Sequence, residues 1–194
     1  MNSNDKLVSD TIVNNKMQKN NTDSIKTAPI PDSFLDLKLG APFSEFIANH
    51  PNAHQQEDDF FTFDLSLMGC VIYFDDMERP YILDNFKTKS GDELEIRAFF
   101  FNDRLAAIYV EYKNGVYVTD KVYSAFNDKY GDPTYSEVKS EYHNTKSYYW
   151  IAKSCVLNFL YKSDIGDLFL VFADRAVQDK IVDKRKNKNS ESIE

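Results

Sequence analysis

Two cysteines and three histidines are the residues best suited to nucleophilic or metal chemistry. Cys70 and Cys155 lie in apolar runs typical of strands, where a free cysteine behaves as a small buried hydrophobe. His50, His54 and His143 match neither H-E-x-x-H nor any cysteine spacing used by zinc sites. The sequence therefore predicts no catalytic residue, no metal site and no cofactor. It leaves open a disulfide between the two cysteines in an exported protein.

Acidic side chains gather in two places, residues 57–59 and the group Asp75, Asp76 and Glu78. Neither follows the ordered spacing of a calcium loop, so we interpret both as solvated loops. The chain contains neither G-x-x-x-x-G-K-[ST] nor G-x-G-x-x-G, and its six glycines disfavour phosphate-cradling loops. Two carboxylates that are brought together only by folding could catalyse hydrolysis. A carboxylate-based hydrolase is the least favoured hypothesis.

Aromatic residues are the most unusual part of the composition. All 28 lie between Phe34 and Phe172. Runs such as 99–101 and 148–150 are strand-like, so neighbouring rings must point to opposite faces of a sheet. Such a sheet is either covered on both sides or exposes an aromatic patch to a partner. The candidate binding residues are Tyr109, Tyr148, Trp150 and Tyr161.

Charge is uneven along the chain, whose formal net charge is −8. The segment 31–179 holds 14 basic and 25 acidic side chains, a net charge of −11. This segment repels nucleic-acid phosphates and anionic membranes and favours a protein partner with a basic surface. Because no apolar run approaches the roughly 18–20 residues needed to span a bilayer, we expect no transmembrane helix.

Helix and strand patterns alternate along the segment that must position these residues. We expect a short helix within 39–51, and a hairpin of 93–101 and 104–112 around Asn102-Asp103. A second helix is expected to begin near Thr119 as N-cap and to end at Gly131. Further expected elements are strands near 61–65, 70–74, 81–86, 147–152, 155–161 and 167–172, and a last helix from about Asp174. This order predicts an α+β fold, an antiparallel meander sheet with helices packed on one face.

The composition divides the chain into three regions. Residues 1–30 form a polar leader, 31–179 the folded domain, and 180–194 a basic helix end and polar tail. The basic side chains Lys184, Arg185, Lys186 and Lys188 suit the C-terminal end of a helix dipole. The start of the chain lacks a secretory pattern, which indicates a cytoplasmic protein. Alternatively, a removed signal and lipidated cysteine would place it in the periplasm or on a lipid anchor.

The two halves, 37–112 and 114–174, share a pattern of glycine turn, amphipathic helix and meander. The first has Leu39-Gly40-x-x-Phe43-x-x-Phe46, and the second has Thr119-x-x-Val122-x-x-x-Phe126 followed by Gly131-Asp132-Pro133. With the hairpin turn Asn102-Asp103-Arg104-Leu105, this resembles the small-module superfamily of BamE-like lipoproteins and β-lactamase-inhibitor proteins. The resemblance implies a helical layer across an antiparallel sheet whose concave face binds a protein, and it carries over no partner-binding residue. Two unrelated units built from common turns remain the alternative.

Together these features predict a non-enzymatic protein-binding domain, an immunity- or inhibitor-type antagonist of another protein. The first alternative is an extracytoplasmic, lipoprotein-like assembly or accessory module, motivated by the polar leader. A carboxylate-based hydrolase comes third.

Overall fold

The computed structural model describes residue 30 and residues 32–57, 72–74, 77–88, 90–113, 115–139 and 144–191. Within them the chain forms three helices and ten strands. The helices are α2 (Phe43–Asn49), α4 (Gly115–Tyr130) and α5 (Arg175–Glu191). The strands are β1 (Ser33–Phe34), β2 (Leu37–Lys38), β3 (His54–Gln55), β4 (Tyr81–Lys87), β5 (Glu93–Phe101), β6 (Arg104–Tyr112), β7 (Tyr135–Lys139), β8 (Thr145–Ile151), β9 (Cys155–Lys162) and β10 (Asp167–Asp174).

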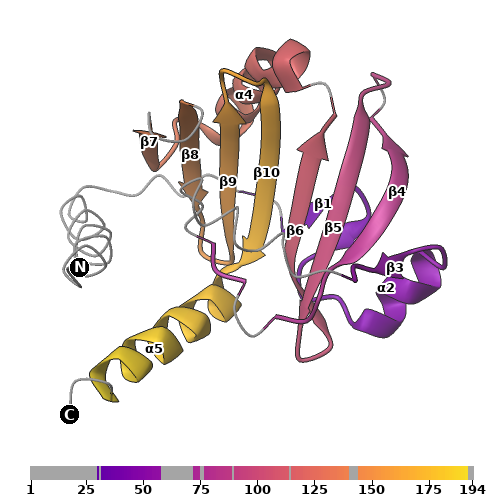
Figure 1. Cartoon of the computed structure of the whole chain (residues 1–194), viewed down its shortest axis with the longest axis vertical. Coiled ribbons are helices and arrows are strands. Elements are labelled where there is room, and N and C mark those ends of the chain that lie inside the picture. The colour runs from indigo at the N-terminus through magenta and orange to yellow at the C-terminus, as the bar shows by residue number, and fades with distance from the viewer. Residues whose placement is uncertain are drawn as a thin grey trace, which may run out of the picture.

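Eight of the strands form one antiparallel sheet in the order β3-β4-β5-β6-β10-β9-β8-β7 (Figure 1). Each half of the chain contributes a helix followed by four strands in sequence order. The halves meet where their last strands pair, with Ile108 of β6 opposite Phe172 of β10. The predicted α+β fold with an antiparallel meander sheet is confirmed.

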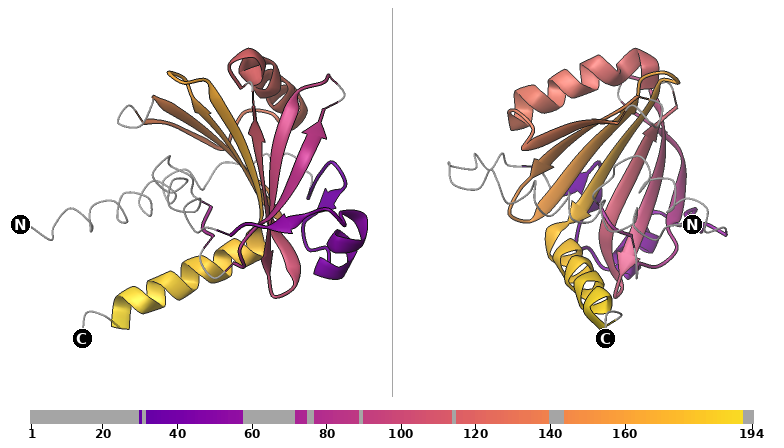
Figure 2. Two further views of the ribbon diagram at one scale, coloured as in Figure 1. Left: turned by 45° about the vertical axis from the view of Figure 1, so that its right-hand side comes forward. Right: turned by 60° about the vertical axis from the view of Figure 1, so that its left-hand side comes forward.

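Helices α2 and α4 cover the same face of the sheet (Figure 2). From α2, Phe46 lies 5.1 Å from Phe100 of β5, measured between ring centroids. From α4, Tyr123 contacts Phe159 and Phe126 contacts Phe172, at 5.7 and 6.5 Å. These rings sit at helical spacing on one side of each helix, so burying them against the sheet removes a continuous apolar stripe from water.

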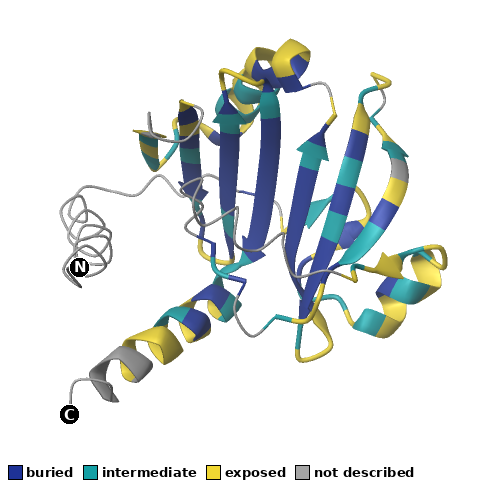
Figure 3. Cartoon of the chain, in the orientation of Figure 1, coloured by how far each residue is buried: buried dark blue, intermediate teal, exposed yellow. Residues whose placement is uncertain are grey.

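The opposite face of the sheet is also apolar near its centre. Phe99, Tyr109, Phe169 and Val171 form a second buried cluster there, together with the segment 72–74. Consequently the central strands β6, β10 and β9 are buried along almost their whole length, whereas the outer strands alternate (Figure 3). A sheet covered on both sides is one of the two outcomes that its aromatic content predicted.

Helix α4 begins a full turn earlier than predicted. The first helical residue is Gly115, and the Thr119 hydroxyl donates to the Gly115 carbonyl at 2.7 Å instead of capping the helix. The end of α4 is confirmed, because Gly131 has φ +78° and its N–H donates to the Asn127 carbonyl at 2.8 Å. The start of α5 is confirmed as well, since the Asp174 carboxylate accepts from the Val177 N–H at 3.2 Å.

Helix α5 leaves the end of β10 and projects away from the sheet (Figure 1). The Gln178 side chain ties it to the segment 72–74, donating to the Tyr73 carbonyl at 3.0 Å and accepting from the Tyr73 N–H at 2.8 Å. The Arg185 guanidinium lies 4.1 Å from the centre of the Tyr73 ring. The expected basic end is therefore part of one helix that runs to Glu191.

Several predicted features fall partly or wholly outside the described residues. Of the expected leader, the structure describes Ile30 alone, which is buried. The expected strand 61–65 lies outside them, and of 70–74 the described part, 72–74, is not a strand. In contrast, β7 was not predicted from the sequence.

Candidate functional site

The four aromatic residues predicted to bind a partner do not share one surface. Tyr148, Trp150 and Tyr161 lie on the face covered by α4, whereas Tyr109 lies on the opposite face. Tyr109 and Trp150 are each only 1% exposed. The predicted roles of Tyr109 and Trp150 as exposed binding residues are therefore wrong.

Helix α4 buries the aromatic rings on its side of the sheet. Its Tyr123 ring lies 4.6 Å from Tyr148 and 6.2 Å from Trp150, between centroids. The Trp150 indole N–H donates to the Gly131 carbonyl at the end of α4, at 2.8 Å. Because the polar edge of the ring is satisfied internally, Trp150 is a core residue. Tyr148 and Tyr161 are half-buried, and a partner contact at either stays a prediction.

Four charged side chains lie together on the opposite face, three of them on β5 and β6 and the fourth, Lys113, directly after β6. Glu95, Arg97, Glu111 and Lys113 form this β5–β6 charged group, in which Glu95 pairs with both cations. The Arg97 guanidinium also lies 3.9 Å from the Glu111 carboxylate and 5.3 Å from the centre of the Tyr109 ring. The group thus balances two carboxylates against two cations.

Burial raises the pKa values of two side chains here, Glu111 of the charged group and the adjacent Tyr109. Desolvation raises the pKa of Glu111 above 4.5, and the nearby Glu95 carboxylate adds to the shift. Desolvation also raises the pKa of the Tyr109 phenol well above its usual value, with the Glu111 charge acting in the same direction. Glu95 and Glu111 are direct cross-strand partners, so their carboxylates extend from neighbouring positions of the sheet.

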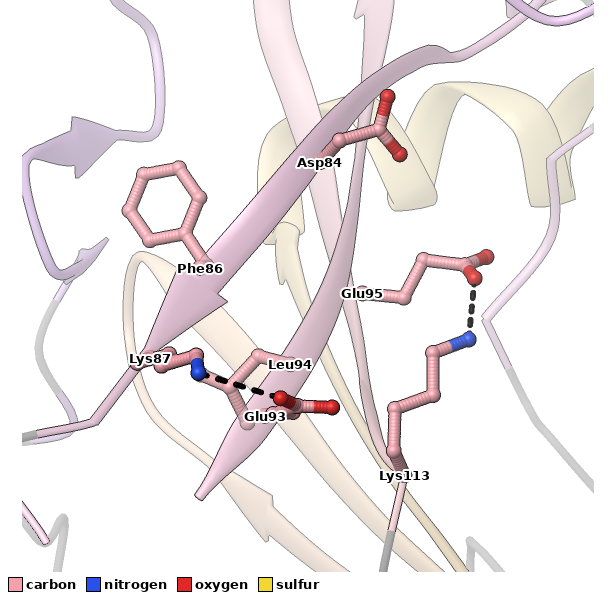
Figure 4. Close-up of a pocket in the computed structure, with 7 residues that line it drawn as sticks. All are labelled: Asp84, Phe86, Lys87, Glu93, Leu94, Glu95 and Lys113. Atoms are coloured by element: carbon pink, nitrogen blue, oxygen red, sulfur yellow. Dashed lines mark hydrogen bonds and ion pairs between the residues drawn. The ribbon is translucent and has the colours of Figure 1, made fainter. Parts of the chain in front are cut away.

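A small pocket opens beside the β5–β6 charged group. It encloses about 190 Å³ at the point where the pairing of β4 with β5 shifts register between Leu83 and Phe86. Its walls carry three carboxylates and two ammonium groups, and the Lys87 and Glu93 side chains pair at 3.2 Å (Figure 4). The lining residues are Asp84, Phe86, Lys87, Glu93, Leu94, Glu95 and Lys113. This volume is below the roughly 300–1,000 Å³ of ordinary small-molecule sites.

The other residues considered for chemistry are dispersed. His50 lies 3.4 Å from Asp36, and His54 lies 3.5 Å from Asp84, so the two histidines belong to separate pairs. Cys155 is fully buried, and desolvation raises the pKa of its thiol to about 12. In the part of the chain that the structure describes, no three His, Cys, Asp or Glu side chains are grouped to hold a metal.

Some of the predicted pairs and clusters cannot be placed. Cys70 and His143 lie outside the described residues, and the proposed disulfide lies outside them with Cys70. Of the two acidic clusters, only Glu57 and Glu78 are described.

An exposed apolar group lies where α4 begins. Val116, Tyr117 and Ile165 are 55%, 85% and 51% exposed, and we call them the apolar tip. They come from the first turn of α4 and from the turn between β9 and β10. A Cβ added at Gly166 would lie 2.7 Å from the Val116 Cβ, so the turn and the helix are in direct contact. The tip is therefore an exposed apolar group on a closely packed base.

Sequence reasoning missed the apolar tip for a specific reason. With the helix placed from Thr119, Val116 and Tyr117 fell in an expected turn, where single apolar residues carry little information. Ile165 stands in the polar turn Ser163-Asp164-Ile165-Gly166, which offered a weak signal. Only the folded chain brings the turn to the start of the helix.

No protein-family model, no curated protein and no solved structure matches this chain. The resemblance to the BamE-like and β-lactamase-inhibitor superfamily therefore stays a prediction. Among the described helices, none is long and apolar enough to cross a membrane.

Proposed function

We propose that this chain is a non-enzymatic binding domain that docks onto a basic protein and blocks it, as an immunity-type inhibitor does. The apolar tip is the observation that carries the proposal. Tyrosine is enriched among the residues that dominate binding energy at interfaces, and Tyr117 is exposed over 85% of its surface. Its backbone is held in the first turn of α4, so docking would order little additional chain.

The net negative charge of the folded domain adds a long-range attraction to the short-range contacts of the apolar tip. The net charge of −11 over residues 31–179 would speed the approach of a basic partner, and salt would weaken that effect. The apolar tip and the net charge have separate roles in this proposal. The tip supplies short-range contact area, and the charge selects the sign of the partner's surface.

Two alternatives use the same structure differently. An extracytoplasmic accessory module would also bind through the apolar tip and would differ in where the protein is found. A carboxylate hydrolase is favoured by the raised pKa of Glu111 next to Glu95. It has weaker support, because Arg97 and Lys113 pair with these carboxylates and Glu111 does not line the pocket.

The test begins with the full chain immobilised in a lysate of the cells from which its gene comes, at low and high salt. The captured protein is then purified, and its affinity is measured by calorimetry for the wild type and for Tyr117→Ala. We expect at least a tenfold loss, since truncation of an interface hot spot costs about 2 kcal/mol or more. Leu35→Ser is the matched control, because Leu35 is 53% exposed and lies in the turn between β1 and β2.

Three results would contradict the proposal. One is the absence of any captured protein at either salt concentration. Another is a partner that binds Tyr117→Ala and the wild type equally well. The third is hydrolytic activity that disappears in both Glu95→Gln and Glu111→Gln, which would establish the hydrolase alternative.

A further inference from the structure

Helix α4 has an inner side packed on the sheet and an exposed outer side. On the inner side, Tyr123 and Phe126 contact rings of β8, β9 and β10. On the outer side, Tyr117 of the apolar tip is 85% exposed, and exposed residues continue along the helix (Figure 3). Because an α-helix has 3.6 residues per turn, the residues three, seven and eleven positions after Tyr117 lie on one stripe with it. This stripe is the part of α4 that a partner of the apolar tip would meet.

Two carboxylates follow Tyr117 along the stripe. The three residues at these positions are Asp120, Ser124 and Asp128, and all of them are exposed. We call Tyr117, Asp120, Ser124 and Asp128 the α4 crest. Among the described side chains, neither Asp120 nor Asp128 has an ion-pair partner. With a rise of 1.5 Å per residue, the two aspartates are about 12 Å apart along the helix axis.

The two lysines of α4 interact with other parts of the fold. Hydrogen bonds from Ser90 and Thr88 lower the pKa of Asp92, and the charge of Lys121 acts in the same direction. Lys121 is therefore near the turn between β4 and β5, which contains Asp92. The Lys129 ammonium lies 5.2 Å from the centre of the aromatic ring of the next residue. The α4 crest consequently has a negative charge.

The two aspartates are not placed where they would stabilise α4. Asp128 lies two residues before the end of the helix at Tyr130, where the helix dipole disfavours a carboxylate. Asp120 lies beyond the first turn, in which a carboxylate would interact favourably with the dipole. Removing either charge should therefore leave the helix intact, and a loss of binding would report on the interface.

We propose that the α4 crest lies against a protein surface with an apolar pocket for Tyr117 and two lysine or arginine side chains in line with that pocket. The nearer cation pairs with Asp120, and the second, about 12 Å farther along, pairs with Asp128. This inference rests on the proposed function, since it takes the apolar tip as the centre of contact. It adds the orientation of the partner, because two charge pairs in line with one pocket align the partner with the axis of α4.

The spacing also defines the chemistry of the partner. A strand with two cations four residues apart on one face, or a helix with two cations eight residues apart, spans about 12–13 Å. Either element could supply the pairs beside an apolar pocket. An acidic protein surface would place like charges against the crest, which disfavours wrong partners.

Removing charge from the crest provides the test. The probe is the protein that the wild-type chain captures and that is purified in the experiment above, and calorimetry measures its affinity. We expect Asp120→Asn and Asp128→Asn each to weaken binding about fivefold or more at about 0.15 M salt, and the double variant to weaken it further. At about 1 M salt these losses should shrink, because salt screens exposed charges.

Two control variants separate the position of a charge from the net charge. Asp103→Asn removes one carboxylate from the turn between β5 and β6, at the other end of β6 from α4, and asparagine tolerates the φ of +58° there. Distance and screening should hold its effect on affinity below about twofold. Asp128→Asn combined with Ala125→Asp has the wild-type net charge, but its carboxylate lies about one turn earlier on exposed α4. This variant should bind as weakly as Asp128→Asn, and circular dichroism confirms that each variant is folded.

The outcomes distinguish this inference from the proposed function. If Tyr117→Ala weakens binding and the double aspartate variant binds as the wild type does, the inference is overturned and the proposed function stands. Affinity restored by Ala125→Asp also overturns the inference, since net charge alone would then explain binding. A captured protein that binds Tyr117→Ala and the wild type equally well contradicts both, and so does the absence of any captured protein.

Discussion

A Cβ atom at Gly115 would lie 2.5 Å from the carbonyl oxygen of Gly166, so the start of α4 and the turn after β9 approach at backbone distance. The same Cβ would lie 2.6 Å from the Leu168 backbone nitrogen. No side chain fits between these groups. This close approach sets both the first residue of α4 and the position of the apolar tip.

Gly115→Ala is therefore expected to destabilise the fold by about 1–3 kcal/mol, the usual cost of overpacking. The change would otherwise gain up to about 1 kcal/mol in helix propensity, so its sign separates the two effects. Urea denaturation measures the free energy of unfolding. Ser124→Ala, at an exposed position of α4, is the control and should change it by less than about 0.5 kcal/mol. A Gly115→Ala variant as stable as the wild type would contradict the close approach.

Trp150 is the single tryptophan of the chain, so its fluorescence reports on one site. Because the ring is 1% exposed beneath α4, acrylamide should quench the folded protein weakly and the urea-unfolded protein strongly. Strong quenching of the folded protein would instead favour the other outcome considered from the sequence, an exposed aromatic patch that includes Trp150. Circular dichroism on the same samples establishes that the weakly quenched protein is folded.

Glu111 makes stability depend on pH in a defined direction. Its pKa is raised in the folded state, chiefly by desolvation, so the folded protein holds this proton more tightly than the unfolded chain does. The contribution of Glu111 to stability therefore falls as pH rises from about 4.5 through the folded pKa. Glu111→Gln should be more stable than the wild type at pH 7.5, and the difference should shrink at pH 4.

The control for this experiment is Glu93→Gln, an exposed carboxylate on the same strand as Glu95. Its ion pair with Lys87 is solvated, so we expect little effect at either pH. Denaturation with urea at both pH values gives the comparison. A Glu111→Gln variant that is less stable than the wild type at pH 7.5 would show that its ion pairs outweigh desolvation.

Cys155 is expected to be unreactive in the folded protein. With a pKa of about 12, only about one thiol in ten thousand is ionised at pH 8, and the side chain is fully buried. Iodoacetamide followed by peptide mapping should leave Cys155 unmodified until urea is added. Peptide mapping resolves Cys155 from Cys70, so rapid labelling of the Cys155 peptide without denaturant would refute this.

The sequence predicted the fold well where local patterns decide it. The hairpin of β5 and β6, the exit of α4 at Gly131 and the start of α5 after Asp174 all follow from turn residues and capping groups. Alternation of apolar residues placed β8, β9 and β10 correctly. These features depend on residues close together in the chain.

The sequence failed where distant residues decide. Period-2 alternation shows that Trp150 and Tyr109 leave the sheet on particular faces, but it does not show that another element covers each face. Gly115 fits a turn equally well until Gly166 is brought against it by the strands between them. The apolar tip, the burial of the aromatic rings and the start of α4 all depend on such contacts, so the candidate site was almost wholly unpredictable.

The pairing of β6 with β10 also constrains how the chain can fold. Strand β6 closes the first half and is buried along nearly its whole length, but the partner that covers its free edge is β10, the last of the described strands to be synthesised. A nascent chain that has completed only its first half therefore presents an apolar, unpaired strand to the cell. Folding of the whole domain waits for β10, and a ribosome stalled in the second half would leave this edge open to aggregation or to a chaperone.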